Sequence, residues 1–318
     1  MNVEDYIKGL TTGNISTLGK AITLIESSLD KDKEKAEKLI EKCIPLIGNS
    51  IRIAVSGTPG VGKSTFIETL GIELIKKKKK IAVLAIDPSS ALSQGSILGD
   101  KTRMEKLSNS KLAFVRPSPN SGILGGVTNS TKNAITICEA AGFDIIIIET
   151  VGVGQSEFLA QSMTDFFIYL TLIQNGDELQ FSKKGILELS DVIIINKADQ
   201  NKTKAKDVAL GLKNSVQNHK AEKNIFICSA LTGFNISAIW IHIQKMYLNK
   251  TQTGEIEKTR HQQNLYWFEK NIITECNELV LKKIKLKNII NKLKKDSLIN
   301  PRQHARKIIE TILKEDLK

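Results

Sequence analysis

A glycine-rich segment reads Gly57-Thr58-Pro59-Gly60-Val61-Gly62-Lys63-Ser64-Thr65 and directly follows the apolar run 51–55. The spacing G-x-x-x-x-G-K-[ST] is typical of a phosphate-binding loop (P-loop). Its glycines let successive backbone N–H groups turn inward, and the next helix directs its positive N-terminus at the phosphates. In such a loop Lys63 meets the β- and γ-phosphate oxygens, and Ser64 offers its hydroxyl group to Mg²⁺. The alternative is an incidental glycine-rich turn, but the apolar run before the segment and the helix-forming residues after it favour the phosphate site.

From residue 51 onward, apolar runs rich in β-formers alternate with helical patterns. The runs cover 51–56, 81–86, 112–115, 144–149, 166–173, 191–196 and 225–228. This alternation predicts an α/β fold with a doubly wound, mainly parallel sheet. Because ligands of such sheets bind at the carboxyl ends of the strands, we expect the polar motifs that follow the runs to converge at one edge.

The two ends of the chain are predicted to be helical. Residues 3–48 carry helical periodicity, with apolar side chains on one face over 15–29 and again at 39–40, and Pro45 and Gly48 break this pattern. Near the other end, five aliphatic residues recur at seven-residue spacing on one helical stripe: Leu265, Ile272, Leu279, Leu286 and Leu293. We therefore expect a helical N-terminal extension (1–48), a P-loop domain (49–250) and a helical C-terminal arm (251–318).

The stripe of the arm has two interpretations. The positions three residues further on are mixed, namely Phe268, Glu275, Lys282 and Ile289, which argues against an isolated two-stranded coiled coil. The arm could pack on its own domain, or it could also build a dimer.

Composition narrows the class of protein. Of the 318 residues 41% are hydrophobic and 25% charged, and no apolar run is long enough to span a membrane. The N-terminus lacks both a secretory signal and an Arg-rich transit pattern, so a cytoplasmic location is expected. The net charge is +12, but only six of the 46 basic residues are Arg, and the run 76–80 fits the end of a helix. Nucleic acid is therefore not an expected partner. The four Cys and four His residues show no zinc-binding spacing.

Acidic residues follow two of the predicted strands. Asp87 ends the second strand, and Asp100 lies in the polar stretch after it. Because a carboxylate beside a P-loop can hold Mg²⁺ directly or through water, both are candidate metal ligands, although Asp87 before a proline could be an ordinary turn residue. The apolar run 143–148 delivers Glu149 to the same edge, where it can orient metal or water. Gly152 can bring a backbone N–H group against a γ-phosphate.

The run 191–195 is followed by Asn196-Lys197-Ala198-Asp199, an N-K-x-D pattern. The Asp199 carboxylate can accept hydrogen bonds from guanine N1–H and the 2-amino group, a pattern that adenine cannot offer. Ser229-Ala230-Leu231, just after the last predicted strand, fits a loop that supports the base with backbone N–H groups. The sequence therefore predicts selective binding of GTP and GDP with Mg²⁺.

Together these residues resemble the MeaB/ArgK-type GTPases, whose animal member is called MMAA, within the SIMIBI class of P-loop proteins. The matching blocks are 21–27, 57–65, 87–90, 95–104, 116–119, 125–127, 149–157, 176–180, 183–185 and 196–199. The resemblance implies a homodimeric GTPase, which favours the dimer-building interpretation of the arm. It also implies a chaperone that gates cofactor delivery to an adenosylcobalamin-dependent acyl-CoA mutase and protects the mutase from inactivation. Methylmalonyl-CoA mutase is the usual partner, and the adenosyltransferase is a further one.

By the same resemblance, residues 174–184 form a third switch that couples GTPase and mutase, with Asp177, Gln180 and Lys183 as its candidate active residues. The usual water-positioning Gln does not directly follow Gly152, and no Arg after the P-loop offers an internal finger. We therefore expect slow hydrolysis alone and faster hydrolysis with the mutase, although Lys183 could instead be a solvated helix residue. Phe181-Ser182 and 91–94 depart from the family pattern, which leaves the switching behaviour open.

The sequence is less consistent with two other functions. A nickel-delivery GTPase for hydrogenase or urease shares the P-loop and the guanine motif, but such proteins usually carry His-rich or Cys-containing metal sites, which this chain lacks. A protein kinase would need a catalytic loop of the H-R-D-x-x-x-x-N type, and no such pattern occurs.

Overall fold

The computed structural model describes residues 1–27, 29–48, 50–86, 104–116, 124–150, 156–173, 184–216, 224–284 and 300–315. The chain divides into two compact units, residues 1–260 and 261–318. Within the described ranges, no helix has both the length and the apolar character needed to cross a membrane.

The first unit is built on a seven-stranded sheet in the order β3-β2-β4-β1-β5-β6-β7, and every neighbouring pair is parallel. Each strand coincides with a predicted apolar run to within one residue at either end, so the predicted doubly wound parallel fold is confirmed. The strands are β1 (Ile51–Gly57), β2 (Ile81–Ile86), β3 (Ala113–Arg116), β4 (Ile145–Thr150), β5 (Phe166–Leu172), β6 (Val192–Asn196) and β7 (Asn224–Ile227).

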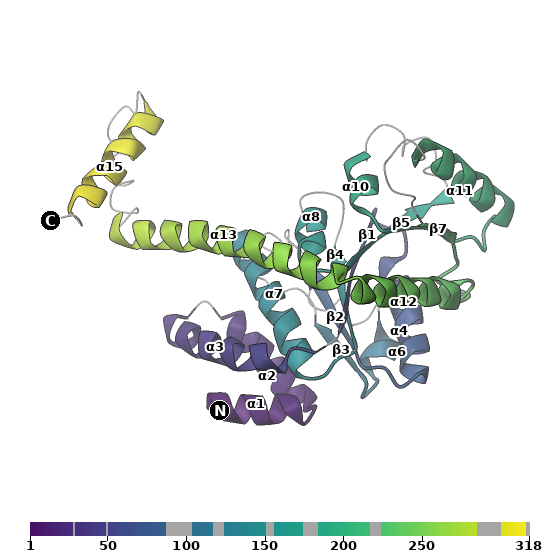
Figure 1. The fold of residues 1–318 in the computed structure, drawn as a ribbon, viewed down its shortest axis with the longest axis horizontal. Coiled ribbons are helices and arrows are strands. Elements are labelled where there is room, and N and C mark those ends of the chain that lie inside the picture. Colours follow the sequence, from purple (N-terminus) through teal and green to yellow (C-terminus); the bar gives the residue numbers. More distant parts are fainter. Residues whose placement is uncertain are drawn as a thin grey trace. The chain divides into compact units, whose positions relative to one another are not determined.

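Helices cover both faces of this sheet (Figure 1). On one face α4 (Lys63–Lys76), α6 (Glu105–Ser108) and α12 (Ile236–Gln252) contribute to one apolar core with alternate residues of β1, such as Ile53 and Val55. On the other face lie α7 (Leu124–Ala140) and α8 (Ser156–Gln161). The remaining helices of this part are α10 (Lys184–Leu189) and α11 (Lys202–Val216). Because β4 is covered on both sides, every residue from Ile145 to Thr150 is buried.

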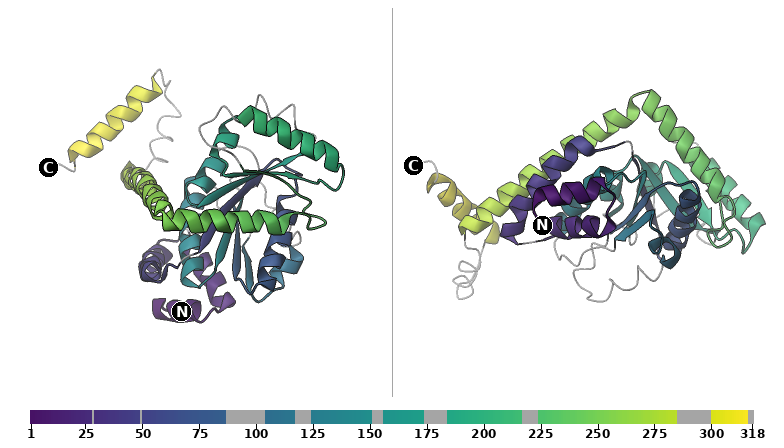
Figure 2. Two further views of the ribbon diagram at one scale, coloured as in Figure 1. Left: turned by 45° about the vertical axis from the view of Figure 1, so that its right-hand side comes forward. Right: turned by 90° about the horizontal axis from the view of Figure 1, so that it is seen from below.

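The N-terminal extension consists of α1 (Val3–Thr11), α2 (Ile15–Ile25) and α3 (Asp30–Cys43), followed by a 3₁₀ turn, Ile44–Leu46. These helices pack against α7, and Figure 2 shows them from two further sides. Leu18, Ala21 and Ile22 are buried as the periodicity predicts, whereas Ile15 and Leu29 are exposed. The reason is that Ile15 begins α2 and Leu29 caps α3, so the expected continuous face is divided between two helices.

The C-terminal segment contains α13 (Glu255–Ile284), which begins in the first unit and continues into the second, and α15 (Pro301–Glu315). The stripe residues Leu265, Ile272 and Leu279 are 55%, 48% and 59% exposed. Leu286 and Leu293 lie outside the described residues. The expected domain boundaries at residues 48 and 250 stay predictions.

Candidate nucleotide site

The P-loop connects the end of β1 to the start of α4 and lies at the carboxyl edge of the sheet. Gly57 has φ +152°, and a Cβ atom at this position would lie 2.4 Å from the Leu170 carbonyl oxygen of β5. Since that oxygen belongs to the backbone of a buried strand, it cannot move away cheaply. Only glycine lets the chain leave β1 so close to its neighbour, which explains the first glycine of the motif.

The P-loop is joined to the N-K-x-D segment through side-chain contacts. A Cβ atom on Gly62 would lie 2.7 Å from Asn196 Nδ2, and this amide donates a 2.9 Å hydrogen bond to the Val61 carbonyl oxygen. Lys197 Nζ donates to the Gly60 carbonyl oxygen at 2.8 Å. The P-loop and the N-K-x-D segment, whose contacting residues are 135 and 137 positions apart in the chain, thus lie side by side.

Lys63 and Ser64 occupy the first turn of α4. The buried Lys63 Nζ donates to the carbonyl oxygens of Gly57 at 2.8 Å and Thr58 at 3.3 Å, which holds the ammonium group at the loop where phosphates would bind. The Ser64 hydroxyl group donates to Glu149 Oε1 at 2.8 Å. Glu149 is buried and pairs in register with Val55 of β1.

This arrangement fits a magnesium ion. A hydroxyl and a carboxylate oxygen are hard ligands of the kind that Mg²⁺ prefers, and here they lie in direct contact beside the P-loop. When bound, Mg²⁺ would neutralise charge on the β- and γ-phosphates. The described side chains contain no group of three or more His, Cys, Asp or Glu residues that could hold a metal ion.

The N-K-x-D segment lies directly after β6. Asn196 Oδ1 accepts a 2.9 Å hydrogen bond from the Ala230 N–H group, and Ala198 N–H donates to the Cys228 carbonyl oxygen at 2.9 Å. Asp199 is exposed, so its carboxylate is accessible to a ligand. The fold therefore brings the loop 229–231 next to the N-K-x-D segment, as expected from their positions after neighbouring strands β6 and β7.

Sequence reasoning missed a buried polar layer on the α8 side of the same edge. Thr150 Oγ1 donates to Ser56 Oγ at 2.9 Å, and Ser56 Oγ donates to Glu157 Oε1 at 3.4 Å. Burial, with the nearby Glu157 carboxylate, raises the pKa of Tyr169 to about 12. The available signal was weak: Thr150 and Glu157 lie in the matching block 149–157 and Ser56 lies directly before the P-loop, but no local pattern shows that their side chains meet.

Six predicted site residues lie outside the described residues. They are Asp87, Asp100, Gly152, Asp177, Gln180 and Lys183. The segments 91–94 and 181–182, which depart from the family pattern, also lie outside. The roles of these residues stay predictions.

A second charged cluster lies at the amino edge of the sheet, away from the P-loop end of β1. Arg52 forms two hydrogen bonds with the carboxylate of Glu139, at 2.9 and 2.7 Å, and its backbone N–H group donates to Asp165 Oδ2 at 2.8 Å. Arg260 forms two hydrogen bonds with Asp165, at 2.8 and 2.7 Å, and one with the Ser50 carbonyl oxygen at 2.6 Å. These four side chains, called the amino-edge cluster below, satisfy one another.

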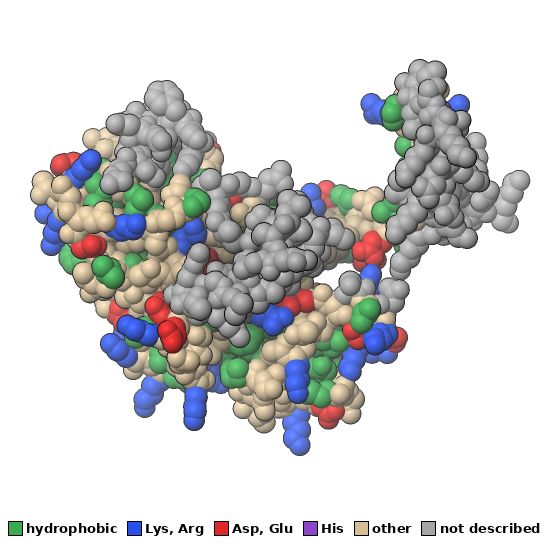
Figure 3. All heavy atoms as spheres, turned by 180° about the vertical axis from the view of Figure 1, so that it is seen from behind, with side chains coloured by type: hydrophobic (Ala, Val, Ile, Leu, Met, Phe, Trp, Pro, Cys, Tyr) green, Lys and Arg blue, Asp and Glu red, His purple; other side chains and the backbone are tan. Residues whose placement is uncertain are grey.

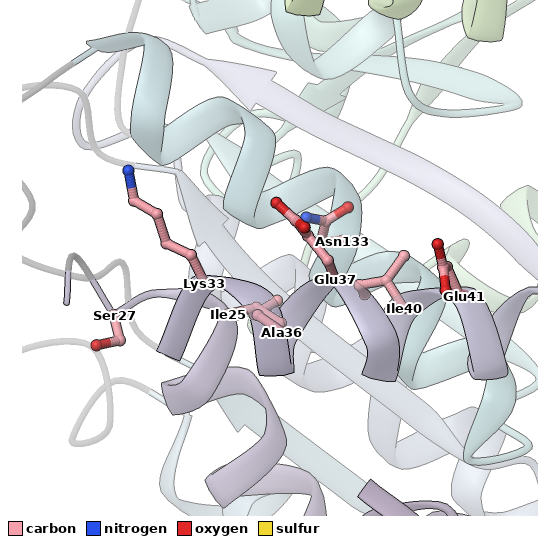
Figure 4. Close-up of a pocket in the computed structure, with 8 residues that line it drawn as sticks. All are labelled: Ile25, Ser27, Lys33, Ala36, Glu37, Ile40, Glu41 and Asn133. Carbon is pink, nitrogen blue, oxygen red and sulfur yellow. The ribbon is translucent and has the colours of Figure 1, made fainter. Parts of the chain in front are cut away.

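The surface has two further features. A groove of about 410 Å³ lies between α2, α3 and α7, with Ile25, Ala36 and Ile40 as its apolar residues and Glu37 close to Asn133 (Figure 4). None of its lining residues belongs to a nucleotide motif. On the face shown in Figure 3, the described Lys and Arg side chains stand singly or in small groups among acidic ones and form no broad basic patch.

Comparison with known proteins places this geometry in a family. The sequence model of the methylmalonyl-CoA mutase-associated GTPase MeaB matches residues 18–286. GTPase ArgK of Escherichia coli is 40% identical over 274 residues, which cover 84% of this chain and 83% of ArgK. The mitochondrial methylmalonic aciduria type A homolog of Mus musculus is 39% identical over 289 residues, which cover 86% of this chain and 69% of the mouse protein.

A solved structure is similar over nearly the whole chain. The crystal structure of a LAO/AO transport system kinase has a TM-score of 0.75 and 31% sequence identity, and the match covers 98% of this chain and 97% of that one. Fold, P-loop and guanine motif thus agree with the sequence matches. The chain is a P-loop GTPase and belongs to the MeaB family of methylmalonyl-CoA mutase-associated GTPases.

Proposed function

We propose that this GTPase is a chaperone for an adenosylcobalamin-dependent acyl-CoA mutase, with methylmalonyl-CoA mutase as its partner. In this role it gates the loading of adenosylcobalamin and protects the mutase from inactivation. The observation that carries the proposal is the extent of the family match, which runs from residue 18 to residue 286. It therefore includes helices outside the nucleotide site, where contacts with a partner protein would be made.

We assign the nucleotide roles as follows. Residues 57–65 bind the phosphates, Asp199 reads the guanine base, and Asn196 and Lys197 hold the P-loop beside it. The Ser229-Ala230-Leu231 loop supports the base. The Mg²⁺ ligands come from Ser64, Glu149, Asp87 and Asp100. Hydrolysis further depends on Lys63, Gly152 and the third switch with Asp177, Gln180 and Lys183.

The mutase test measures GTP hydrolysis by the purified chain with and without methylmalonyl-CoA mutase. We expect slow basal turnover and at least tenfold stimulation by the mutase, because the partner completes the stabilisation of the transition state. Lys183→Ala should keep its GTP affinity but lose most of the stimulation. Transfer of adenosylcobalamin to the mutase, followed by absorbance, should depend on GTP hydrolysis.

Several outcomes would contradict this assignment. No complex and no stimulation with the mutase would remove the partner, and equal stimulation of wild type and Lys183→Ala would remove Lys183 from the mechanism. The nickel-delivery alternative predicts instead stoichiometric binding of Ni²⁺, which calorimetry measures directly.

The homodimer is proposed to form through the C-terminal arm. The exposed apolar residues Leu265, Ile272 and Leu279 of α13 support this, because a second copy could bury such a stripe. We expect the variant Leu265→Glu/Ile272→Glu to sediment as a monomer. The control Leu248→Glu, at an α12 position that is 55% exposed, should sediment like the wild type. A dimer that survives the double substitution would place the interface elsewhere.

A further inference from the structure

The loop 229–231 is held from two sides by side chains. The Ala230 N–H group donates to Asn196 Oδ1 at 2.9 Å, and the Ala230 carbonyl oxygen accepts a 2.8 Å hydrogen bond from Thr69 Oγ1. Thr69 lies in the second turn of α4, the helix that begins with Lys63 and Ser64. The helix at the phosphates and the loop at the base are therefore tied by a hydrogen bond between residues 161 positions apart.

Further contacts make this connection stiff. One turn beyond Thr69, the Glu73 carboxylate accepts a hydrogen bond from the Ser237 hydroxyl group at the start of α12. Leu70 and Leu74 of α4 belong to the same buried cluster as Ala230 and Trp240. Because the apolar contacts fix the distance between α4 and α12, the Thr69 hydroxyl group sets the position of the Ala230 peptide rather than of the whole helix.

We propose that Thr69 is a positioning residue for recognition of the 6-oxo group of guanine. The proposal rests on the guanine site assigned above. Guanine presents an acceptor at C6 where adenine presents an amino group, so a backbone N–H donor at this place distinguishes the two bases. The Ala230 N–H group is engaged with Asn196, which leaves the next peptide, that of Leu231, to donate to the base. Leu231 is 79% exposed.

The test is Thr69→Val, which keeps the shape of the side chain but removes the donor to Ala230. We expect the affinities for GTP, GDP and ITP to fall by the same factor, about three- to tenfold, because all three ligands carry the 6-oxo group. The affinities for ATP and inorganic tripolyphosphate should stay unchanged, as should kcat at saturating GTP. Thr69→Ser should restore binding of guanine nucleotides, and Thr69→Ala should behave like Thr69→Val.

The matched control is Thr251→Val on α12. The Thr251 hydroxyl group also donates to a backbone carbonyl oxygen, that of Tyr247 at 2.8 Å, but within its own exposed helix turn. This variant should bind all five ligands like the wild type.

Two results with Thr69→Val would overturn the proposal. Unchanged affinities in Thr69→Val would show that the hydroxyl group does not position the loop. An equal loss for tripolyphosphate would show that Thr69 supports the phosphate helix instead. The variant Asp199→Asn distinguishes a wrong role for Thr69 from a wrong guanine site. If Asp199→Asn shifts the preference from GTP toward XTP while Thr69→Val changes no affinity, the guanine site is correct and only the role of Thr69 is wrong. If neither variant changes base preference, the site itself is misplaced.

Discussion

The two edges of the sheet use buried charge in opposite ways. At the amino edge, Arg52, Glu139, Asp165 and Arg260 form short hydrogen bonds with one another, and the side chains of Glu139 and Asp165 are 0% and 1% exposed. At the carboxyl edge, Lys63 contacts backbone carbonyl oxygens and Glu149 contacts the hydroxyl group of Ser64. The amino edge pairs opposite charges with each other, whereas at the carboxyl edge Lys63 and Glu149 each contact a neutral group beside the P-loop, where a ligand would bind.

We therefore expect the charged groups of the amino edge to stabilise the fold and those of the carboxyl edge to bind the ligand. A buried ion pair is costly to break, because removal of one partner leaves the other charge without compensation. Groups that bind phosphate and Mg²⁺ gain their main partners from the ligand, so their loss should cost activity rather than folding. Glu139 and Glu149 allow a direct comparison, since both are buried glutamates and both can be replaced by glutamine.

The largest expected effect comes from this matched pair of variants. Glu139→Gln should lower the free energy of unfolding by about 3 kcal/mol, because Arg52 loses its anionic partner in a buried site. Glu149→Gln should change it by less than about 1 kcal/mol but lower kcat about 10²- to 10³-fold, because a neutral amide is a poor ligand for Mg²⁺. Urea unfolding and GTP turnover at varied Mg²⁺ concentration measure both quantities on both proteins.

An exposed pair provides the control for the stability effect. Arg306 and Glu310 form an ion pair on α15, with side chains that are 80% and 49% exposed, so Glu310→Gln should shift the free energy of unfolding by less than about 0.5 kcal/mol. If Glu139→Gln changed the free energy of unfolding as little as Glu310→Gln, the amino-edge cluster would not stabilise the fold.

The strands and the phosphate site are features that the sequence predicts from local patterns. The strands of the sheet were predictable because strands covered on both faces give continuous runs of β-branched residues, as Ile145–Ile148 of β4 shows. The phosphate site was predictable because its chemistry depends on backbone conformation over adjacent residues. The sequence assigns Glu149 and Ser64 separately to Mg²⁺. The structure places the two side chains in direct contact, and their role as Mg²⁺ ligands stays a prediction.

Contacts between distant residues could not be predicted in this way. Arg52 and Glu139 are 87 positions apart, Arg260 and Asp165 are 95 apart, and no local pattern reveals which charges meet. The same holds for Asn196, whose amide supports the P-loop and the loop 229–231 together. The sequence indicated that Asn196 is part of the base motif, but its contacts depend on the order of β1, β5, β6 and β7 in the sheet.

The second-largest expected effect concerns Asp199, an exposed acidic residue at the carboxyl edge. Asp199→Asn should weaken GTP binding by about 30-fold, equivalent to about 2 kcal/mol, because the carboxylate's charge-assisted hydrogen bonds to N1–H and the 2-amino group are replaced by weaker or mismatched ones. The amide can donate a hydrogen bond, so affinity for XTP should rise in the same variant. Competition binding against a fluorescent nucleotide measures both changes. Unaltered GTP affinity would show that Asp199 does not contact the base.

The smallest expected effect concerns a lysine next to the amino-edge cluster. Burial, together with the nearby positive charge of Arg52, lowers the pKa of Lys132 on α7 to about 8. An unfolded lysine has a pKa of about 10.4, so between pH 8 and 10.4 the unfolded chain binds more protons and stability should rise with pH. Below pH 8 both states carry the proton, and the full cost of the buried charge is present.

Lys132→Met keeps most of the apolar stem and should therefore raise the free energy of unfolding at pH 7 by about 1 kcal/mol, after allowance for solvent screening of this half-buried group. This gain should disappear as the pH approaches 10, because the wild-type amine is then neutral in the folded state. Urea unfolding at pH 7 and pH 10 measures the difference, with Lys111→Met at an exposed position as the control. If Lys132→Met were destabilising at pH 7, the amine would make a favourable contact in the cluster, and the amino edge would need this additional cation to balance its two carboxylates.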